Sequence, residues 1–337
     1  MQKIKKHIEI VRASKSSLSS MSIGSALALR KALAQVYTKV GITNISTQSD
    51  LDLLALFKPD LVFLGMKQLP TSHGTIWLAD FLDDLDIPYT GSAKNAHELE
   101  INKSKAKKRA MHVGLKTSAF FVAVQGTEVV EEDIPFSYPV FIKPTDRGGG
   151  VGIDDKSVAR NFDQLKSKVE SISLGNNADS LIEMFLDGRE FSIAILREAG
   201  SDKFMVMPLE LIAPPNSQGD RLLSSAIKSA DTEEFMAVEH GSLRNAVMEL
   251  ALHVFHALGA RDYGRIDIRL DGAGVPHFLE ANLMPSILKD YGNFPKACML
   301  NETIGYEESI LRIVDLAFER SADTQQVSLV RPAMLAA

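Results

Sequence analysis

Four consecutive apolar residues, Leu61 to Leu64, restrict the fold of this 337-residue chain more than any other short segment. They follow a helical run that ends at Lys58-Pro59, because proline disfavours the α conformation at the residue before it. A strand that is apolar on both faces must be covered on both faces, and this is the environment of strands in parallel sheets. The segment therefore predicts an α/β fold for this part of the chain.

Two flanking regions extend the same unit. Residues Ile8 to Val11 read as a short strand, and an Ala- and Leu-rich helix is expected from about Ser25 to Val36. A broad apolar face from His73 to Leu85 predicts another helix. We place a domain boundary near residue 95, so that residues 1–95 form an open parallel-sheet α/β domain.

The composition indicates a globular protein with more than one domain. The chain is 45% apolar and 24% charged, and its length exceeds what one hydrophobic core usually serves, so two or three domains are expected. A net charge of -6 and a pI near 5.8 argue against a nucleic-acid or membrane partner, since both attract basic surfaces. No apolar run reaches about 18 residues and no signal-peptide core is found, so a cytoplasmic location is expected. The single cysteine, Cys298, excludes an internal disulfide framework.

The rest of the chain predicts two further lobes and a tail. A very basic helix is expected from Asn102 to His112, and an amphipathic helix from Leu243 to Leu258 stops at Gly259. The polar stretch from Pro214 to Thr232 reads as a mobile loop, in which Arg221 and Lys228 are candidates for a phosphate contact. Strands are expected at residues 138–143, 180–184, 190–196 and 204–209. We assign a central lobe to residues 96–180, a C-terminal lobe to residues 181–322 that ends in a helix from Tyr306 to Arg320, and a flexible tail to residues 323–337.

A charged hairpin from Gly264 to Asn282 is the first chemical signal. If Leu270 pairs with Val275 across the turn, alternation of side chains places charged and amide groups on one face and core residues on the other. On this register the charged face carries Arg265, Asp267, Arg269, Phe278, Glu280 and Asn282. Two carboxylates and an amide oxygen suit Mg²⁺, which prefers hard oxygen ligands. A solvent-exposed hairpin whose charges only pair with one another is the alternative interpretation.

A glycine cluster, Gly148 to Gly152, is the second signal. Glycines without a Cβ allow backbone N-H groups to approach an anion, and Lys143 just before the loop could add a positive charge. The Walker pattern is absent, because no Gly-Lys-Ser/Thr follows, and an ordinary turn remains an alternative. The basic run Lys103 to Arg109 is typical of a solvated helix face, although one of its lysines could point inward to phosphate.

Six short segments occur in a characteristic order along the chain. They are Asn102-Lys103, Tyr138-Pro-Val-Phe-Ile-Lys143-Pro, the glycine cluster, Ile182-Glu183 with Gly188-Arg-Glu190-Phe, Gly264-Arg265-Ile-Asp267, and Phe278-Leu-Glu280-Ala-Asn282-Leu-Met-Pro285. Together they resemble the signature series of the D-alanine-D-alanine ligase family within the ATP-grasp superfamily. The resemblance runs from about Ser20 to Arg320.

This resemblance implies a fold, two cofactors and a reaction. The fold would be the α/β N-terminal domain followed by a two-lobed α+β ATP-grasp fold. The cofactors would be ATP and Mg²⁺ (or Mn²⁺), and the enzyme would join a small carboxylic acid or amino acid to an amine through an acyl phosphate, with release of ADP. A homodimer is inferred only from the resemblance. D-alanine-D-alanine ligation is the leading single activity that it implies.

The resemblance also implies a role for each matched residue. Lys103 and Lys143 would contact the phosphates, and the loop from Gly148 to Gly152 would close over them. Glu183 and Leu186 would meet adenine, and Glu190 would hold the ribose. The implied metal ligands are Asp267, Glu280 and Asn282, and the implied catalytic residues are Arg265, Gly149 and Gly150.

Several positions depart from the family pattern, and they concern the substrates more than the nucleotide. The departures fall at Ser20, Gly65-Met66, Gly149, Met184, the segment between Gly219 and Asp231, and Gly292-Asn293. At Ser20 the family places a glutamate that receives the ammonium of the first amino acid. We therefore expect a ligase of altered substrate choice, with a ligase for other amino acids or small carboxylates as one alternative. A catalytically weak ATP-binding module that regulates a partner is a second alternative.

Overall fold

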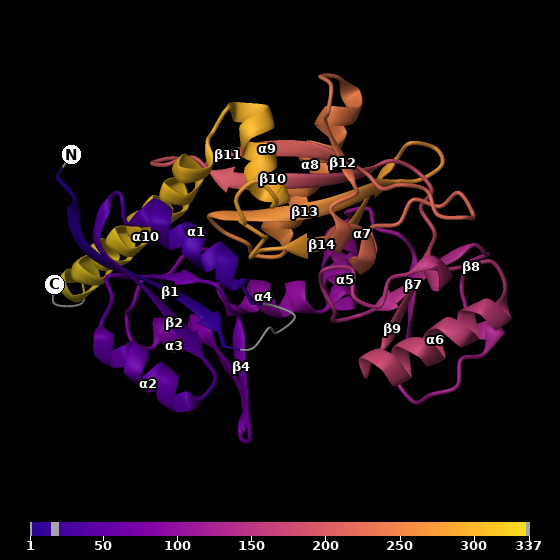
Figure 1. The fold of residues 1–337 in the computed structure, drawn as a ribbon, viewed down its shortest axis with the longest axis horizontal. Coiled ribbons are helices and arrows are strands. Elements are labelled where there is room, and N and C mark those ends of the chain that lie inside the picture. The colour runs from indigo at the N-terminus through magenta and orange to yellow at the C-terminus, as the bar shows by residue number, and fades with distance from the viewer. Residues whose placement is uncertain (1, 15–19, 335–337) are drawn as a thin grey trace.

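The computed structural model describes residues 2–14 and 20–334, and it arranges them as three main sheets flanked by helices. The N-terminal sheet and the C-terminal helix lie at one end of the molecule, and a small sheet with one long helix lies at the other (Figure 1). A five-stranded sheet stands between them. Among the described helices, none combines the length and the apolar character needed to cross a membrane.

The N-terminal sheet is parallel, with the strand order β2-β1-β3. Its strands are β1 (Ile4–Ala13), β2 (Tyr37–Ile45) and β3 (Leu61–Leu64), and its helices are α1 (Ile23–Leu33), α2 (Gln48–Phe57) and α3 (Leu78–Asp83). All four residues of β3 are at most 2% exposed. The predicted parallel α/β fold of this part is thus confirmed.

The prediction of a helix from His73 to Leu85 is wrong for the first half of this segment. A hairpin of β4 (Gln68–Thr71) and β5 (Gly74–Trp77) occupies this stretch, and α3 begins only at Leu78. The Thr71 hydroxyl donates to the carbonyl of Gly74, whose φ of 126° is accessible to glycine. Local turn chemistry therefore overrides the apolar periodicity of the segment.

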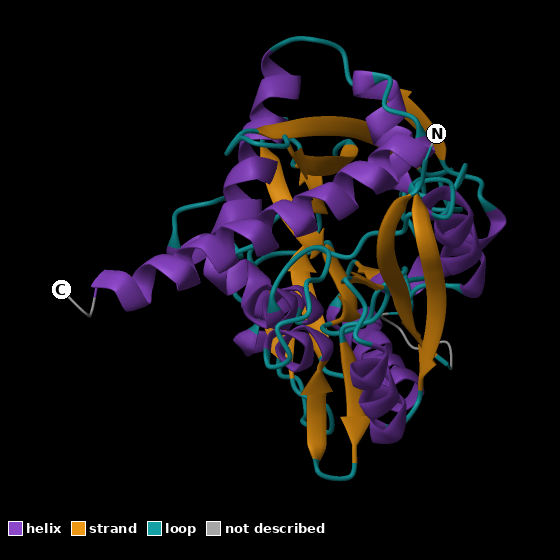
Figure 2. Ribbon diagram, turned by 90° about the vertical axis from the view of Figure 1, so that its left-hand side faces the viewer, coloured by secondary structure: helices purple, strands orange, loops and turns teal. Residues whose placement is uncertain are grey.

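The C-terminal helix α10 (Tyr306–Met334) returns to the N-terminal sheet and completes its core. Buried residues Ile310 and Val314 of α10 belong to one cluster with Ile8, Ile10 and Phe63. The helix extends well past the expected end at Arg320, so the expected tail is helical as far as Met334, and residues 335–337 lie outside the described residues. Figure 2 shows α10 projecting beyond the body of the molecule.

The middle sheet is antiparallel, with the order β6-β9-β7-β8. Its elements are β6 (Phe120–Ala123), η1 (Glu131–Asp133), β7 (Val140–Pro144), η2 (Asp155–Ser157), β8 (Val158–Ala159), α6 (Phe162–Asn176) and β9 (Ser180–Met184). Because β9 pairs with both β6 and β7, a lobe boundary at residues 180/181 would divide one sheet. We therefore propose that the central lobe extends through β9.

The C-terminal sheet is also antiparallel, with the order β12-β11-β10-β13-β14. Its strands are β10 (Glu190–Arg197), β11 (Phe204–Ile212), β12 (Glu234–Ala237), β13 (Tyr263–Leu270) and β14 (Pro276–Asn282). The remaining helices are α4 (Lys94–Ile101), α5 (Lys103–His112), α7 (Ser225–Ala230), α8 (Ser242–Ala257) and α9 (Asn293–Glu302). The short helix α7, capped by Ser224, lies inside the stretch that the sequence predicts as a loop.

Candidate active site

The hairpin β13-β14 positions the acidic residues, but on a register different from the expected one. Leu270 pairs with Pro276, and an irregularity beside Ile268 then shifts the pairing, so that Asp267 opposes Glu280 and Arg265 opposes Asn282. The extra residue between these two pairings is Leu279. The bulge thereby restores the expected common face for the metal-ligand candidates.

Phe278 does not share that face, which corrects the prediction. It pairs with Ile268, is 0% exposed and belongs to the core under α8. Leu279, expected on the core face, instead lines a pocket beside Glu280. The sequence could not reveal this exchange, because a bulge adds one residue without changing the apolar character of either neighbour.

Asp267 is held on both carboxylate oxygens. Its Oδ1 accepts from Ser192 Oγ at 2.8 Å and from Arg265 Nε at 2.9 Å, and its Oδ2 accepts from Arg265 at 2.8 Å. Asn282 Nδ2 donates to the same Oδ2 at 3.2 Å. The Arg265 side chain is 12% exposed, and although its partial burial acts to lower its pKa, Asp267 raises it, so the guanidinium stays charged.

Glu280 lies among cations contributed by distant parts of the chain. Its Oε2 is 3.7 Å from Lys103 Nζ at the start of α5. Burial acts to raise the pKa of Glu280, but Lys103, Lys143, Lys228 and Arg265 together lower it to about 2. Glu280 is therefore ionised, and the surrounding lysines form a positive field that would attract phosphates.

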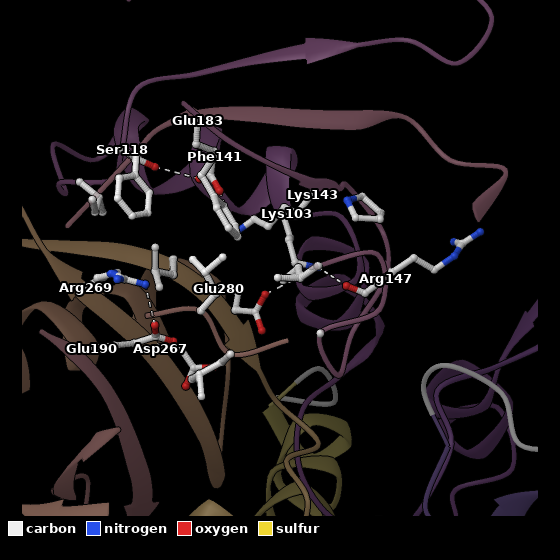
Figure 3. Close-up of a pocket in the computed structure, with 18 of the residues that line it drawn as sticks. Lys103, Ser118, Phe141, Lys143, Arg147, Glu183, Glu190, Asp267, Arg269 and Glu280 are labelled. Carbon is white, nitrogen blue, oxygen red and sulfur yellow. Dashed lines mark hydrogen bonds and ion pairs between the residues drawn. The ribbon is translucent and has the colours of Figure 1, made fainter. Parts of the chain in front are cut away.

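A second buried carboxylate, Glu183, lies at the end of β9. Its oxygens are 2.6 Å from Lys107 Nζ and 2.8 Å from Lys143 Nζ, and Ser118 Oγ donates to it at 2.8 Å. Burial opposes its ionisation, yet Lys107 and Lys143 bring its pKa to about 2. Figure 3 shows Ser118, Glu183 and Lys143 on one wall of the pocket and Glu190, Asp267 and Arg269 on the other.

Lys107 is the functional candidate that sequence reasoning missed. It is 0% exposed, and its ammonium also donates to Thr117 Oγ1 at 2.7 Å and to the carbonyl of Phe278 at 3.1 Å. Burial lowers its pKa to about 8. The available signal was its place in the basic run, where it lies one helical turn after Lys103 and therefore on the same face of α5.

A pocket between the middle and C-terminal sheets gathers most of the expected nucleotide residues. The expected residues that line it are Lys103, Lys143, Gly150, Glu183, Leu186, Glu190, Lys228, Asp267 and Glu280. Glu190 Oε2 is 3.1 Å from Arg269, and burial raises the pKa of Glu190. Apolar side chains Phe141, Phe185 and Leu222 line the same pocket, which suits a flat aromatic base with a polar tail.

The glycine loop reaches this pocket at one end and meets the 214–232 segment. Gly150 has a φ of 77°, and a Cβ there would lie 2.7 Å from Ser225 N and 2.9 Å from Leu223 O. Close approach of the two loops therefore requires glycine at this position. Gly152 does not line this pocket, and a Cβ there would lie 2.6 Å from Pro144 Cγ, so glycine is needed for the turn. Arg221, the other phosphate candidate, donates to the carbonyl of Ala213 and does not line this pocket.

A larger chamber of about 500 Å³ adjoins the pocket. Apart from Gly152, it receives the expected site residues that the first pocket lacks, namely Gly148, Gly149, Arg265 and Asn282. Six residues line both cavities, and they are Lys103, Arg147, Leu223, Lys228, Asp267 and Glu280. The charged centre of the site is thus the junction between a narrow pocket and an open chamber.

The donors at this junction fit a hard divalent cation in their chemistry. Asp267 and Glu280 are cross-strand partners, and Asn282 adds an amide oxygen on the same face. Within residues 2–14 and 20–334, no cluster of three His, Cys, Asp or Glu side chains could hold a metal by itself. Any metal site here therefore needs the amide and oxygens from its bound partners.

Comparisons of the sequence and of the structure with known proteins point to the same family. The family model described as "D-ala D-ala ligase C-terminus" matches residues 111–315, more than half of the chain. A D-alanine-D-alanine ligase of Chlorobaculum tepidum is 30% identical over 281 residues, which cover 80% of this chain and 72% of that protein. One of Hydrogenovibrio crunogenus is 29% identical over 240 residues, which cover 70% and 71%. The crystal structure of the D-alanine-D-alanine ligase from Bacillus anthracis complexed with ATP matches 95% of this chain and 99% of that chain, with a TM-score of 0.74 and 17% identity.

Proposed function

Because this chain belongs to the D-alanine-D-alanine ligase family and is an ATP-dependent ligase of the ATP-grasp type, we propose that it joins a small carboxylic acid to an amine through an acyl phosphate. Adenine and ribose would occupy the narrow pocket, and the acid and the amine would occupy the chamber. The observation that carries this proposal is the row of charged residues shared by both cavities. The γ-phosphate of ATP placed in the pocket would face the acid at that junction.

The chemistry begins with two anions that repel each other. The carboxylate oxygen attacks the γ-phosphorus, the bond from that phosphorus to the bridging oxygen of ADP breaks, and an acyl phosphate forms. Lys103, Lys143 and Lys228 would neutralise the phosphates during this step, because all three line the pocket. Asp267, Glu280 and Asn282 would hold Mg²⁺ or Mn²⁺, which supplies further neutralisation of phosphate charge.

The second step forms the amide bond. The amine attacks the acyl carbon, a tetrahedral oxyanion develops, and inorganic phosphate leaves as the amine loses its proton. Arg265 lines the chamber and is charged, so we propose that it stabilises the oxyanion. Loss of one such donor costs about 3 to 4 kcal/mol of transition-state stabilisation in comparable sites. Gly149 and Gly150 would close the loop over the reacting phosphate.

The substrates of this chain are a separate proposal. D-alanine is the substrate named for the relatives, and the rewritten chamber positions argue that this chain joins a different pair of small molecules. Glu183 and Leu186 would contact adenine and Glu190 the ribose, as the family resemblance implies. We also propose a cytoplasmic enzyme, consistent with its need for ATP, and the homodimer stays a prediction.

The test uses purified protein with Mg-ATP and a panel of carboxylic acids and amines, singly and in pairs. D- and L-amino acids are included. ADP release, phosphate release and product mass are measured together. We expect ADP formation that depends on an acid, and an amide product with at least one pair. ATP binding without ADP formation for any pair would favour the alternative of a regulatory ATP-binding module.

A further inference from the structure

One wall of the chamber is formed by the N-terminal unit and is poor in negative charge. Ser20, Ser22 and Ser25 line it at the start of α1, and Lys67 lines it beside β3. Ser22 caps α1, accepting from the amide of Ser25 at 3.0 Å. The positive end of the helix dipole therefore lies at this wall.

The sequence shows that this wall has no local carboxylate. No Asp or Glu occurs between Glu9 and Asp50, a stretch that includes α1 and both of its flanking segments. Glu9 is itself engaged by Thr43 Oγ1 at 2.6 Å and by His7 Nε2 at 2.8 Å, and it does not line the chamber. An ammonium group placed against α1 would therefore find hydroxyls and a helix N-terminus, which do not compensate a buried cation.

Glu100, the carboxylate that pairs with Lys67, already has partners on both of its oxygens. Its Oε1 is 2.8 Å from Lys67 Nζ and accepts from the amide of Leu283 at 2.7 Å, and its Oε2 is 2.8 Å from His97 Nδ1. Burial acts to raise its pKa, but Lys67 and then His97 lower it to about 2. Glu100 thus orients Lys67 and has little capacity left for a substrate cation.

The other carboxylates of the chamber serve other partners or lie elsewhere. Asp267 and Glu280 belong to the charged junction, and Asp146 is 2.7 Å from Arg147. Glu233 lines the chamber from the segment before β12, and its Oε2 has no hydrogen-bond partner among the described residues. Negative charge available to a substrate ammonium is therefore found on the β12 side and not on the α1 side.

Lys67 gives the α1 wall a preference for oxygen acceptors. Its side chain is 9% exposed, and an ammonium has three donors, of which Glu100 uses one. The remaining donors, with the serine hydroxyls and the end of α1, favour oxygen acceptors. Since Arg265 lines the same chamber, the reacting carboxylate would lie between Arg265 and the α1 wall.

From this arrangement we propose that the acid activated by ATP carries no ammonium group next to its reacting carboxylate. That position instead bears an oxygen acceptor, either a hydroxyl or a second carboxylate, so the substrate class is small hydroxy acids or dicarboxylic acids. Lys67 and the serines of the α1 wall donate hydrogen bonds to this oxygen. The inference rests on the proposed function, because it assigns one substrate of that reaction.

The first experiment traps the acyl phosphate without any acceptor amine. Hydroxylamine attacks the acyl carbon, phosphate leaves and a hydroxamate forms, so the acid alone is tested. Matched acids are compared with the whole enzyme and Mg-ATP: D-alanine with D-lactate, L-alanine with L-lactate, aspartate with malate, and succinate and malonate as dicarboxylic acids. We expect ADP and hydroxamate from an ammonium-free acid at a rate at least about tenfold above its amino counterpart.

Each outcome separates the inference from the proposed function. An amino acid that is preferred in every productive pair overturns the inference and leaves the ligase proposal standing. ADP formation with no acid at all overturns the ligase proposal itself. If an amino acid is used and Glu233→Gln abolishes its use, the donor ammonium lies at Glu233 and our assignment of the α1 wall is wrong.

A matched pair of variants tests the wall directly. Ser22→Asp and Ser22→Asn both provide good helix caps, and only the first adds a carboxylate. Relative to Ser22→Asn, Ser22→Asp should shift the rate ratio of D-alanine to D-lactate by about tenfold toward the amino acid. Equal ratios in the two variants would show that charge at this wall does not select the acid.

Discussion

Replacement of Lys107 by methionine tests the buried ion pair at the centre of the nucleotide pocket. Methionine keeps most of the side-chain volume and removes the charge and its hydrogen bonds. Lys107 is 0% exposed, and its Nζ lies 2.6 Å from Glu183 Oε1. Breaking a buried pair by removing one partner costs about 3 to 5 kcal/mol. Because Glu183 keeps Lys143 and Ser118, each at 2.8 Å, we expect about 3 kcal/mol.

The cost should depend on the charge of Glu183. Glu183→Gln removes the charge that Lys107 compensates, so the double variant should be less destabilised than the sum of the two single variants, by at least about 1 kcal/mol. Urea unfolding of the four proteins, with and without ADP, measures this coupling. The matched control is Lys108→Met, since Lys108 is the exposed neighbour on α5 and should cost less than about 0.5 kcal/mol.

Two results would refute the reasoning. Strictly additive effects would mean that Lys107 and Glu183 do not interact energetically, whatever their distance. If Lys107→Met loses no more unfolding free energy than Lys108→Met, removal of one partner of the buried ion pair would have no measurable cost. If the coupling appears and ADP affinity falls only in variants of Lys107 and Glu183, the pair serves to position Glu183 for the nucleotide.

Further predictions concern the metal ligands, the glycine loop and the response to pH. Asp267→Asn and Glu280→Gln should each reduce ADP formation at least about 100-fold with an unchanged circular dichroism spectrum, and full activity in both would refute the metal assignment. Gly150→Ala should raise the KM for ATP about tenfold, because its Cβ would lie 2.7 Å from Ser225 N. The matched comparison is Gly149→Ala, which is also at positive φ but has open space around its Cβ. Equal effects of the two substitutions on the KM would exclude the loop contact. The pKa of Glu100 is lowered to about 2 from 4.5, so its contribution to stability is complete above pH 4.5 and is lost as the pH falls toward 2. Unfolding free energies between about pH 5 and pH 3 should therefore decrease less steeply for Glu100→Gln than for the unchanged protein, and parallel slopes would contradict this.

Much of the site is predictable, because its residues lie in strands that can be recognised from the local sequence. Lys143 and Glu183 lie near the ends of strands, and Asp267 and Glu280 lie on facing strands, so each position could be read from local sequence. The bulge at Leu279 could not, because it depends on how β14 meets its neighbours. The sequence therefore predicts the wrong face for Phe278, and it predicts a common face for Asp267 and Glu280 correctly only because the bulge compensates for the shifted pairing.

Lys107 and Lys67 illustrate a second limit. Lysines in a basic run or beside a loop are usually solvated, and nothing local distinguishes these two from their neighbours. Each is buried because a carboxylate from a distant segment, Glu183 or Glu100, lies within 2.8 Å of it. Such pairings are set by tertiary contacts, and only the folded structure reveals them.

The return of α10 to the first sheet has a consequence for how the protein is made. The strands that carry Ile8, Ile10 and Phe63 leave the ribosome long before Ile310 and Val314, with which they share their core. Domains usually fold in the order of their synthesis, but this one keeps an apolar face uncovered until α10 is available. We therefore expect a ribosome that stalls before residue 310 to release a chain whose first domain exposes the apolar face that α10 would cover.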